Sequence, residues 1–152
     1  MAILIRETQL TDLKPWTNLW QSYLSFYQSE TLGKHITDLL WQRIHTVEHP
    51  IHCLVAQDSQ SKELIGLVHF MNHSDTWSKN DVCYLEDLFV CGDHRNSGVG
   101  EALINAVHQR AYKKKWARVY WHTKENNKRA RSLYDKLTGG PDGFISYRLS
   151  TN

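Results

Sequence analysis

One stretch, residues 82–109, constrains the fold of this chain more than any other. It reads VCYLEDLFVCGDHRNSGVGEALINAVHQ. Its first ten residues are rich in β-branched and aromatic side chains, which is typical of a largely buried strand. Beyond the glycines, apolar residues recur every three or four positions, which predicts an amphipathic helix. These residues are Val99, Ala102, Leu103, Ala106, Val107 and Ala111. The glycines therefore lie where a strand passes into a helix.

The turn between this strand and helix is suited to bind phosphate. The first turn of a helix presents backbone N–H groups without an intrahelical partner, and the helix dipole favours an anion there. A Walker A loop does not fit, because Glu101 follows Gly100 where that motif has lysine. A Rossmann motif does not fit either, because position 103 is Leu103 rather than its third glycine. The pattern present is Arg95-x-x-Gly98-x-Gly100.

This pattern resembles motif A of the GNAT superfamily of N-acetyltransferases, in which the turn binds the pyrophosphate of acetyl-CoA. Arg95, Gly98 and Gly100 match the three fixed positions of the motif. The resemblance implies an α/β fold with a mixed, mostly antiparallel central sheet flanked by helices. It also implies an enzyme, an acetyl-CoA-dependent N-acetyltransferase.

A second segment, residues 121–134, resembles motif B of the same superfamily. It has Asn127, an alanine three residues later, and Tyr134 four residues beyond that. Within the superfamily, the chain is most similar to the small histone and polyamine acetyltransferases of the spermidine/spermine type. The similarity lies in Tyr84-Leu-Glu-Asp-Leu-Phe-Val90, in the Trp-rich first helix and in residues 70–77.

The resemblance implies which residues bind acetyl-CoA. Backbone groups of the strand would contact the pantetheine arm, and the turn would bind the pyrophosphate. The implied residues are Leu88, Phe89, Val90, Arg95, Asn96, Ser97, Gly98, Val99, Gly100, Glu101 and Asn127. Two of them have a second interpretation: the Arg95 side chain either fixes the turn or meets a phosphate, and Asn127 is either a cofactor contact or the N-cap of a helix.

Acetyl transfer requires a neutral amine, whereas a free alkyl amine has a pKa of about 10.4 and is protonated at neutral pH. Glu86 and Asp87 are adjacent in the predicted strand, so we expect them on opposite faces, with at most one addressing a given pocket. The resemblance implies Glu86 as the general base, acting through water, with either carboxylate attracting a cationic acceptor. The alternative is a carboxylate that pairs with an arginine or caps a loop.

Tyr134 matches the residue that protonates the leaving thiolate in the family. Helical spacing places it beside Ala130, Leu133 and Leu137, which face the core. A packed tyrosine with its hydroxyl bonded elsewhere is therefore the alternative interpretation.

The segment from Leu13 to Tyr27 predicts a helix with a very aromatic face. Core packing is the simpler interpretation of these side chains. Their number exceeds what one inner stripe needs, so some of them, with Trp20 and Tyr27 as candidates, are expected to line a substrate pocket and contact a cation.

The rest of the chain alternates strands and helices. Besides the elements of residues 82–109, we predict strands at residues 3–6, 52–57, 64–71, 117–123 and 144–149 and helices at 13–27, 36–47 and 126–137. A break is predicted at residues 29–33. The inward face of the second helix is expected to carry Ile36, Leu39, Leu40, Ile44 and Val47. We expect one N-acetyltransferase domain over residues 1–152.

Composition and charge narrow the class of protein further. A net charge of +2 gives no support to nucleic-acid binding. The chain shows no signal-peptide pattern and no apolar run of roughly 18 residues, so we expect a cytoplasmic enzyme that does not bind membranes. Three cysteines, Cys53, Cys83 and Cys91, are expected as reduced thiols, mostly buried. No metal is expected, because His69 and His73 in one strand would lie about 13 Å apart.

The acceptor is expected to be a small cationic amine, either a polyamine or an amino acid, acetylated directly from the thioester. The alternatives are a lysine on a protein or histone tail and, in a different class, a module that binds acyl-CoA without catalysis. Resemblance to the polyamine subgroup also implies a homodimer, in which residues 144–149 exchange between protomers after the Gly-Gly-Pro-Asp-Gly hinge.

Overall fold

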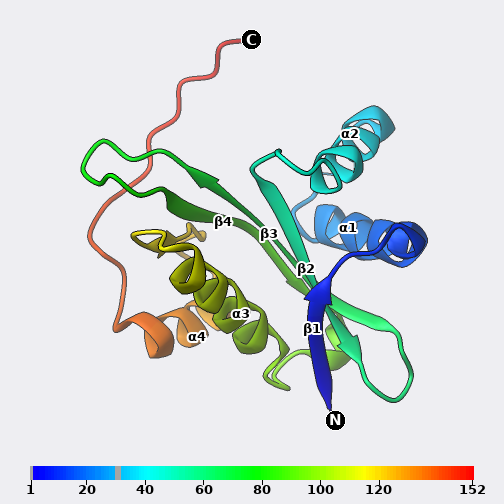
Figure 1. Ribbon diagram of the computed structural model, residues 1–152. Helices are drawn as coiled ribbons and strands as arrows, with labels where there is room; N and C mark the ends of the chain where they lie inside the picture. Colours follow the sequence, from blue (N-terminus) through cyan, green and yellow to red (C-terminus); the bar gives the residue numbers. More distant parts are fainter. Residues whose placement is uncertain (1, 30–31) are drawn as a thin grey trace. The chain divides into compact units, whose positions relative to one another are not determined.

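The computed structural model describes residues 2–29 and 32–152, and its chain divides into two compact units. The first unit extends to Trp121, and the second comprises His122–Asn152 (Figure 1). Each unit is described by itself below. The single domain predicted over residues 1–152 stays a prediction. The break predicted at residues 29–33 falls partly on residues 30–31, which lie outside the described residues.

The first unit is built on a five-stranded sheet with the strand order β1-β2-β3-β4-β5. Strands β1 to β4 pair antiparallel with their neighbours, and β4 pairs with β5 in parallel. The strands are β1 (Ile3–Glu7), β2 (Ile51–Asp58), β3 (Leu64–His73), β4 (Val82–Val90) and β5 (Val119–Tyr120). The predicted mixed, mostly antiparallel sheet is confirmed.

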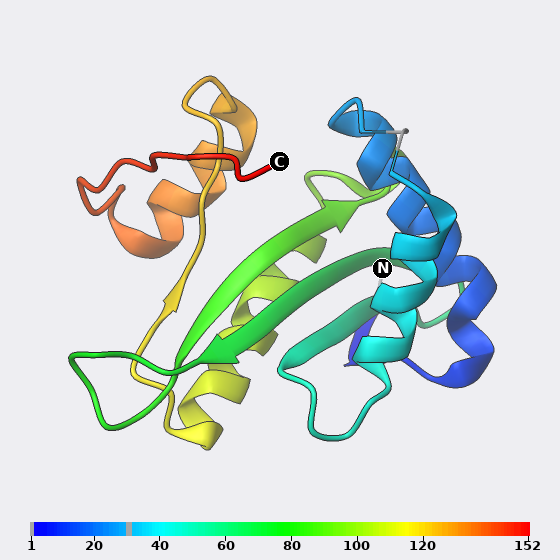
Figure 2. The ribbon, with the colours of Figure 1, turned by 90° about the horizontal axis from the view of Figure 1, so that it is seen from above.

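Helices cover both faces of this sheet. Figure 2 shows α1 (Leu13–Phe26) and α2 (Lys34–Ile44) on one face and α3 (Val99–Lys114) on the other. Short 3-10 turns, η1 (Leu10–Asp12) and η2 (Gly92–His94), lead into α1 and follow β4. The α3 residues predicted to face inward include Val99, Leu103 and Val107, and all three are buried.

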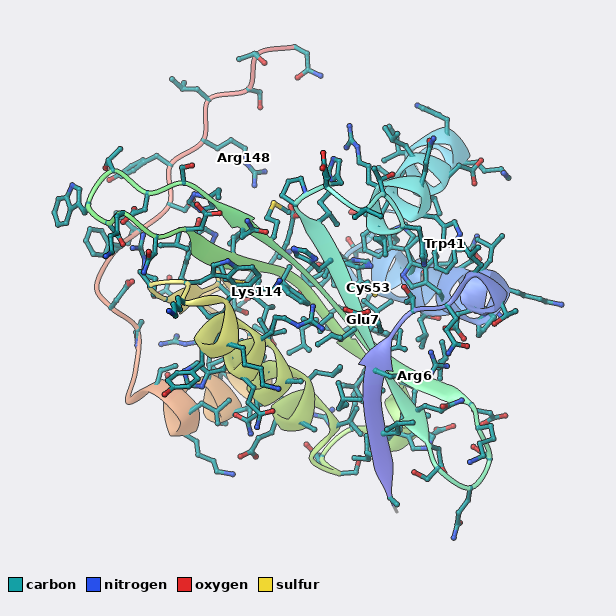
Figure 3. All side chains as sticks on the ribbon, in the orientation of Figure 1. Arg6, Glu7, Trp41, Cys53, Lys114 and Arg148 are labelled. Atoms are coloured by element: carbon teal, nitrogen blue, oxygen red, sulfur yellow. The ribbon has the colours of Figure 1, made fainter. Side chains whose placement is uncertain are left out.

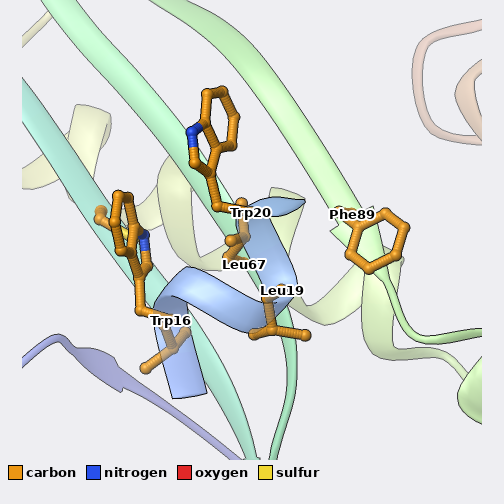
Figure 4. Close-up of a cluster of buried hydrophobic side chains, with 7 residues drawn as sticks. Trp16, Leu19, Trp20, Leu67 and Phe89 are labelled. Carbon is orange, nitrogen blue, oxygen red and sulfur yellow. The ribbon is translucent and has the colours of Figure 1, made fainter. Parts of the chain in front are cut away.

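A cluster of apolar side chains fills the space between α1 and the sheet. Figure 4 shows Trp16 and Trp20 of α1, Leu67 of β3 and Phe89 of β4 as members of it. Trp41 of α2, labelled in Figure 3, packs on Trp16 with ring centroids 4.9 Å apart. The aromatic face of α1 is therefore mainly a core-packing surface.

Two expectations about the outer elements of the first unit were wrong. In α2, Ile36, Leu39 and Val47 were expected to face inward, but all three side chains are exposed. Val47 lies beyond the end of α2 at Ile44, where the helical period no longer decides orientation. The strand predicted over residues 117–123 is also much shorter, because β5 comprises only Val119 and Tyr120.

The second unit contains one helix, α4 (Lys128–Thr138), among the residues described. Asn127 occupies its N-cap position, and Gly139 ends it in the left-handed conformation that glycine adopts readily. The strand predicted at residues 144–149 was wrong, because residues 144–152 have no regular secondary structure. A strand needs a neighbour to complete its hydrogen bonds, and the second unit provides no other strand within its described residues.

Two further properties bear on the expectations from composition. Cys53 and Cys83 are buried, Cys91 is half-buried, and all three are free thiols. Burial raises the pKa of the Cys83 thiol to about 12.

Across residues 2–29 and 32–152, no helix combines the length and the hydropathy that crossing a membrane requires.

Candidate functional site

Glu86 and Asp87 were expected on opposite faces of the sheet because side chains alternate along a strand, but β4 contains an extra residue at this point and the alternation is interrupted. His69 of β3 pairs with Asp87, whereas the next residue, Phe70, pairs with Leu85. Glu86 is therefore a β-bulge without a partner on β3. A bulge breaks the alternation of side chains along a strand. Leu85 and Asp87, two residues apart, consequently lie on opposite faces of the sheet.

Asp87 is the centre of a hydrogen-bonded cluster beneath α1. Its Oδ1 accepts a hydrogen bond from the Tyr23 hydroxyl at 2.7 Å, and its Oδ2 lies 3.0 Å from His69 Nδ1. The Asp87 side chain is 14% exposed. Both carboxylate oxygens therefore already have a protein partner before any substrate arrives.

The ring of His69 lies in the core, between Asp87 and Trp16. The Trp16 indole N–H donates to His69 Nε2 at 3.1 Å, so this nitrogen must carry a lone pair. Burial lowers the pKa of His69, whereas the neighbouring Cys53 and Asp87 side chains raise it, and electrostatics alone would raise the pKa overall. The hydrogen bond from Trp16 decides the protonation state of His69, since a proton on Nε2 would point directly at the indole N–H. His69 is accordingly neutral, with its proton on Nδ1 facing Asp87.

Glu86 differs from Asp87 in having unused hydrogen-bonding capacity. Its side chain is exposed, and its carboxylate makes no hydrogen bond or ion pair within residues 2–29 and 32–152. Burial of part of the group and the charge of Asp87 both raise the pKa of Glu86. Glu86 and Asp87 also both raise the pKa of Tyr23, which shows that the two carboxylates lie near the same hydroxyl. Tyr23 therefore stays protonated as a donor to Asp87.

The turn between β4 and α3 has the conformation that the glycine pattern predicts. Gly98 is the N-cap of α3 and has a φ of 86°, in the left-handed region that disfavours other residues. The first bond into the helix runs from the Ala102 N–H to the Gly98 carbonyl. Ser97 Oγ donates to the His94 carbonyl and closes the turn. The N-terminal N–H groups of α3 are thus set behind a tight turn, as a phosphate site requires.

Arg95 fixes this turn, which is one of the two roles expected for it. Its Nε donates to the Val90 carbonyl at 3.1 Å, and its guanidinium lies over the rings of Phe26 and Phe89. The neighbouring His94 is half-buried. Its Nδ1 is buried and has no hydrogen-bond partner in the described part of the chain.

Strand β4 pairs with β5 at one end only. Cys83 pairs with Val119 and Tyr84 with Tyr120, and the ladder stops there. Along the far edge of β4, residues 85–90 have no paired strand within the part of the chain that the structure describes. The backbone groups of Leu88, Phe89 and Val90 on that edge are therefore not used by the sheet.

A groove of about 770 Å³ runs along α1 beside the turn. One wall carries polar side chains of α1, and the other carries the end of β4 and Arg95. The lining residues are Asn18, Gln21, Ser22, Ser25, Phe26, Phe89, Cys91, Gly92 and Arg95.

A model of the acetyltransferase (GNAT) family matches residues 14–139, which span α1 to α4. The chain belongs to the GNAT acetyltransferase family. The members of this family to which the chain is similar are named as N-acetyltransferases. The chain is accordingly an N-acetyltransferase that uses acetyl-CoA.

Two curated relatives of this GNAT acetyltransferase are named for amino-acid acceptors. The D-amino-acid N-acetyltransferase HPA3 of Saccharomyces cerevisiae is 30% identical over 146 residues, which cover 96% of this chain and 90% of the relative. The thialysine N-epsilon-acetyltransferase of Mus musculus is 32% identical over 114 residues, which cover 67% and 66% of the two chains.

Solved structures share the fold of this GNAT acetyltransferase. A probable acetyltransferase has a TM-score of 0.86 at 21% identity and covers 100% of this chain and 99% of its own. AAC(6')-Iy, solved in complex with a bisubstrate analogue that contains CoA, has a TM-score of 0.80 at 19% identity, with 99% of each chain covered. At these identities the similarity concerns the fold.

The residues of this acetyltransferase fit acetyl-CoA in two respects. The left-handed Gly98 opens the N-terminus of α3 to an anion, as a pyrophosphate requires. The unpaired edge of β4 leaves backbone donors and acceptors for an extended amide-containing chain. Because both features lie in the first unit, the turn and the strand are available to one ligand.

Trp20 and Tyr27, the two aromatic residues expected to line the substrate pocket, have different surroundings in this acetyltransferase. Trp20 is buried, and its indole N–H donates to Thr37 Oγ1 at 3.2 Å, which favours a packing role. Tyr27 is half-buried, and its ring centroid lies 4.9 Å from that of Tyr23. Burial and the charge of Asp87 raise the pKa of Tyr27, so it belongs to the Asp87 cluster.

Tyr134 and Asn127 lie in the second unit of the acetyltransferase. The Asn127 amide donates to Thr123 Oγ1 at 3.1 Å and makes no side-chain cap, although the residue occupies the N-cap position. Tyr134 is half-buried on α4. Its role as an acid stays a prediction, because Glu86 belongs to the other unit.

Sequence reasoning missed three residues of the site: Tyr23, His69 and Trp16. Tyr23 and Trp16 were seen only as part of an aromatic face, and His69 was considered only as a metal ligand. A signal for the two aromatic residues exists in the helical spacing of Trp16, Trp20, Tyr23 and Tyr27, but the partner of Tyr23 is Asp87 and that of Trp16 is His69, both more than 50 residues away along the chain.

Proposed function

We propose that this acetyltransferase transfers the acetyl group of acetyl-CoA directly to a primary amine of a small cationic acceptor, either an amino acid or a polyamine. The observation that carries the proposal is the acidic cluster at the Glu86 bulge, where an exposed carboxylate with no partner among the described residues stands beside a second, half-buried one. Two neighbouring negative charges under an aromatic helix attract an alkylammonium group. The names of the two curated relatives support an amino acid as the first acceptor to test.

The raised pKa of Glu86 suits it to act as a general base. The acceptor arrives as an ammonium ion, and the Glu86 carboxylate takes its proton, directly or through one water. The neutral nitrogen then attacks the thioester carbonyl, so that a C–N bond forms while the C–S bond breaks. Acetyl-CoA supplies the acetyl group and the thiolate leaving group. We assign the proton for that thiolate to the Tyr134 hydroxyl, and the proton that the attacking nitrogen loses as it becomes an amide passes through water to the tyrosinate.

The proposed binding residues for acetyl-CoA remain those of the strand, the turn and the helix start. Leu88, Phe89 and Val90 offer the backbone edge of β4, and the turn offers its N–H groups. The complete set is Leu88, Phe89, Val90, Arg95, Asn96, Ser97, Gly98, Val99, Gly100, Glu101 and Asn127. Asp87 and Tyr27 are proposed to border the acceptor, and Trp20 supports them from the core.

Replacing Glu86 tests the proposed function. We expect Glu86→Gln to lower kcat/KM for the best amine about 100- to 10,000-fold, because the base is lost while the shape is kept. The measurement is thiol release from acetyl-CoA with D- and L-amino acids, thialysine, spermidine, spermine and a basic histone-tail peptide. Glu48→Gln is the control, since Glu48 is also exposed but lies beyond α2.

The outcomes separate the proposal from its alternatives. Turnover of the peptide alone would assign the enzyme to protein modification. Binding of acetyl-CoA without turnover of any amine would indicate a module that binds the cofactor without catalysis. Equal activity of Glu86→Gln and wild type would remove Glu86 from the role of base.

We also propose a homodimer formed through the C-terminal segment. Phe144, Ile145, Tyr147 and Leu149 expose large apolar side chains, and the segment pairs with no strand within the described chain. A second copy would supply such a strand partner. Light scattering at micromolar concentration should give twice the mass of one chain, and removal of residues 144–152 should give the monomer mass. A monomer mass for the full chain would overturn this proposal.

A further inference from the structure

We propose that His69 is a positioning residue for the acetylation reaction: its Nδ1–H, oriented by Trp16, keeps the Asp87 carboxylate fixed beside Glu86 and the acceptor. The inference rests on the proposed function, because it gives a role to a residue next to the proposed base. His69 itself is 1% exposed and so touches neither substrate.

The first step of the argument is the direction of the hydrogen bonds. Trp16 can only donate, since the indole nitrogen has no free lone pair. Its 3.1 Å contact to His69 Nε2 therefore forces the remaining ring proton onto Nδ1. That proton faces Asp87 Oδ2 at 3.0 Å. A buried tryptophan thus sets the tautomer that makes His69 a donor to Asp87.

The second step is the effect of this donor on Asp87. A buried carboxylate stays charged only if hydrogen bonds replace its lost hydration. Asp87 receives one such bond on each oxygen, from Tyr23 on α1 and from His69 on β3. Without His69, one oxygen of a carboxylate that is only 14% exposed would lack a partner. With only the Tyr23 hydroxyl to hold it, the carboxylate would be free to turn away from Glu86.

The third step connects Asp87 to Glu86. The groups near Glu86 are Asp87 on its own strand, His69 on β3 and the Tyr23 hydroxyl on α1. Tyr27 on α1 lies near Asp87, and the Cys53 thiol of β2 lies near His69. Among these neighbours, Asp87 is the one carboxylate. Its charge holds the pKa of Glu86 up and adds to the attraction of a cationic amine.

A matched pair of substitutions at His69 tests this role. The amide nitrogen of His69→Asn takes the place of Nδ1 and keeps the donor to Asp87, but it leaves Trp16 without an acceptor. The longer His69→Gln places its amide group near the position of Nε2, where it accepts from Trp16 but no longer donates to Asp87. Both variants put a polar amide at the same buried position.

We expect the two variants to differ in kinetics. His69→Gln should raise KM for the amine about five- to tenfold, as the loss of one nearby charge implies. It should also move the acidic limb of the kcat/KM profile to lower pH, because Glu86 loses the neighbour that raises its pKa. His69→Asn should keep the wild-type profile and unfold at a lower temperature. In an Asp87→Asn background the two His69 variants should behave alike.

The results that overturn the inference are equally specific. If the Gln and Asn variants lose stability together and keep the same pH profile, His69 is only a core residue. A wild-type protein whose His69 carries protons on both ring nitrogens at pH 7, measured by ¹⁵N NMR of the imidazole, would overturn it without any variant. Failure of the proposed function has another signature: Glu86→Gln would then stay active, or no amine would be acetylated.

Discussion

At the scale of single residues, Asp12 shows how one carboxylate fixes the approach to α1. Arg6 of β1 donates to both of its oxygens, at 2.8 and 3.1 Å, and the Gln9 N–H donates to Oδ2 at 2.7 Å. The Asp12 side chain is 10% exposed. These bonds connect the first strand to the first helix, which carries the aromatic residues of the site.

Asp12→Asn should destabilise the protein by about 1–3 kcal/mol, because a buried arginine bond is lost. The hydrogen bond from Arg6 lowers the pKa of Asp12, so the folded-state pKa lies below the unfolded value. The stabilisation is therefore present above the unfolded pKa and is lost as pH falls through the folded pKa. Urea unfolding of both proteins from pH 7 to pH 2 measures this. Their curves should converge at acid pH, and a constant difference would contradict the prediction.

Also at the scale of single residues, the sequence was enough to predict those site residues whose role depends only on the backbone around them. Arg95, Gly98 and Gly100 belong to one hexapeptide, so their spacing indicated the turn without knowledge of the rest. Tyr23, His69 and Asp87 come from three elements, and only the tertiary fold brings them together. The bulge at Glu86 was not predicted for a related reason, since a bulge depends on how β3 pairs with β4.

At the scale of elements, the close packing of α3 against the sheet depends on Gly66 of β3. A Cβ atom added there would lie 2.9 Å from the Phe89 carbonyl oxygen and 3.2 Å from side-chain atoms of Leu103 and Val99. The same packing positions the strand and the helix that border the turn. A side chain at residue 66 would therefore push β4 and α3 away from β3.

Gly66→Ala is expected to lower the free energy of unfolding by about 1–3 kcal/mol, since the backbone oxygen has to move. Gly92→Ala is the matched control, because a Cβ atom there meets nothing within 4 Å. Thermal unfolding followed by circular dichroism compares them. Equal melting temperatures for the two variants would show that β3 and β4 tolerate the extra methyl group.

Elements with a strong internal period were predicted well, and elements that depend on a neighbour were not. Apart from Tyr27, which follows the end of α1 at Phe26, the periodic residues of α1 and α3 and the predicted strands at 52–57 and 64–71 lie within the observed bounds. Residues 144–149 have the composition of a strand but no partner in their own unit, and β5 pairs over only two residues. The amino-acid composition of a segment indicates its tendency to form a strand, but the hydrogen bonds of that strand are made with other elements of the fold.

At the scale of the whole molecule, binding of acetyl-CoA should stabilise the folded protein. At a ligand concentration of 100 times Kd, the linkage relation gives about 2.7 kcal/mol. For a chain of this length that corresponds to a rise in melting temperature of about 5–10 °C. Differential scanning calorimetry with and without acetyl-CoA measures the shift.

Gly98→Ala should reduce this shift, because the φ of 86° at the turn is unfavourable for alanine. Gly143→Ala is the matched control, since Gly143 has a φ of 87° but lies outside the turn. Both variants carry the same backbone strain without ligand. An equal shift for both would show that the turn does not bind the cofactor.

The three thiols of the chain differ in accessibility, and this difference makes the protein convenient to label. Cys53 and Cys83 are buried, while Cys91 is half-buried and lines the groove beside Arg95. Because thiol-reactive dyes modify accessible cysteines first, a maleimide fluorophore should attach at Cys91 in the native protein. The dye would then sit next to the turn between β4 and α3. The wild-type chain thus contains its own attachment point for a fluorescent reporter of ligand binding, with no engineered cysteine.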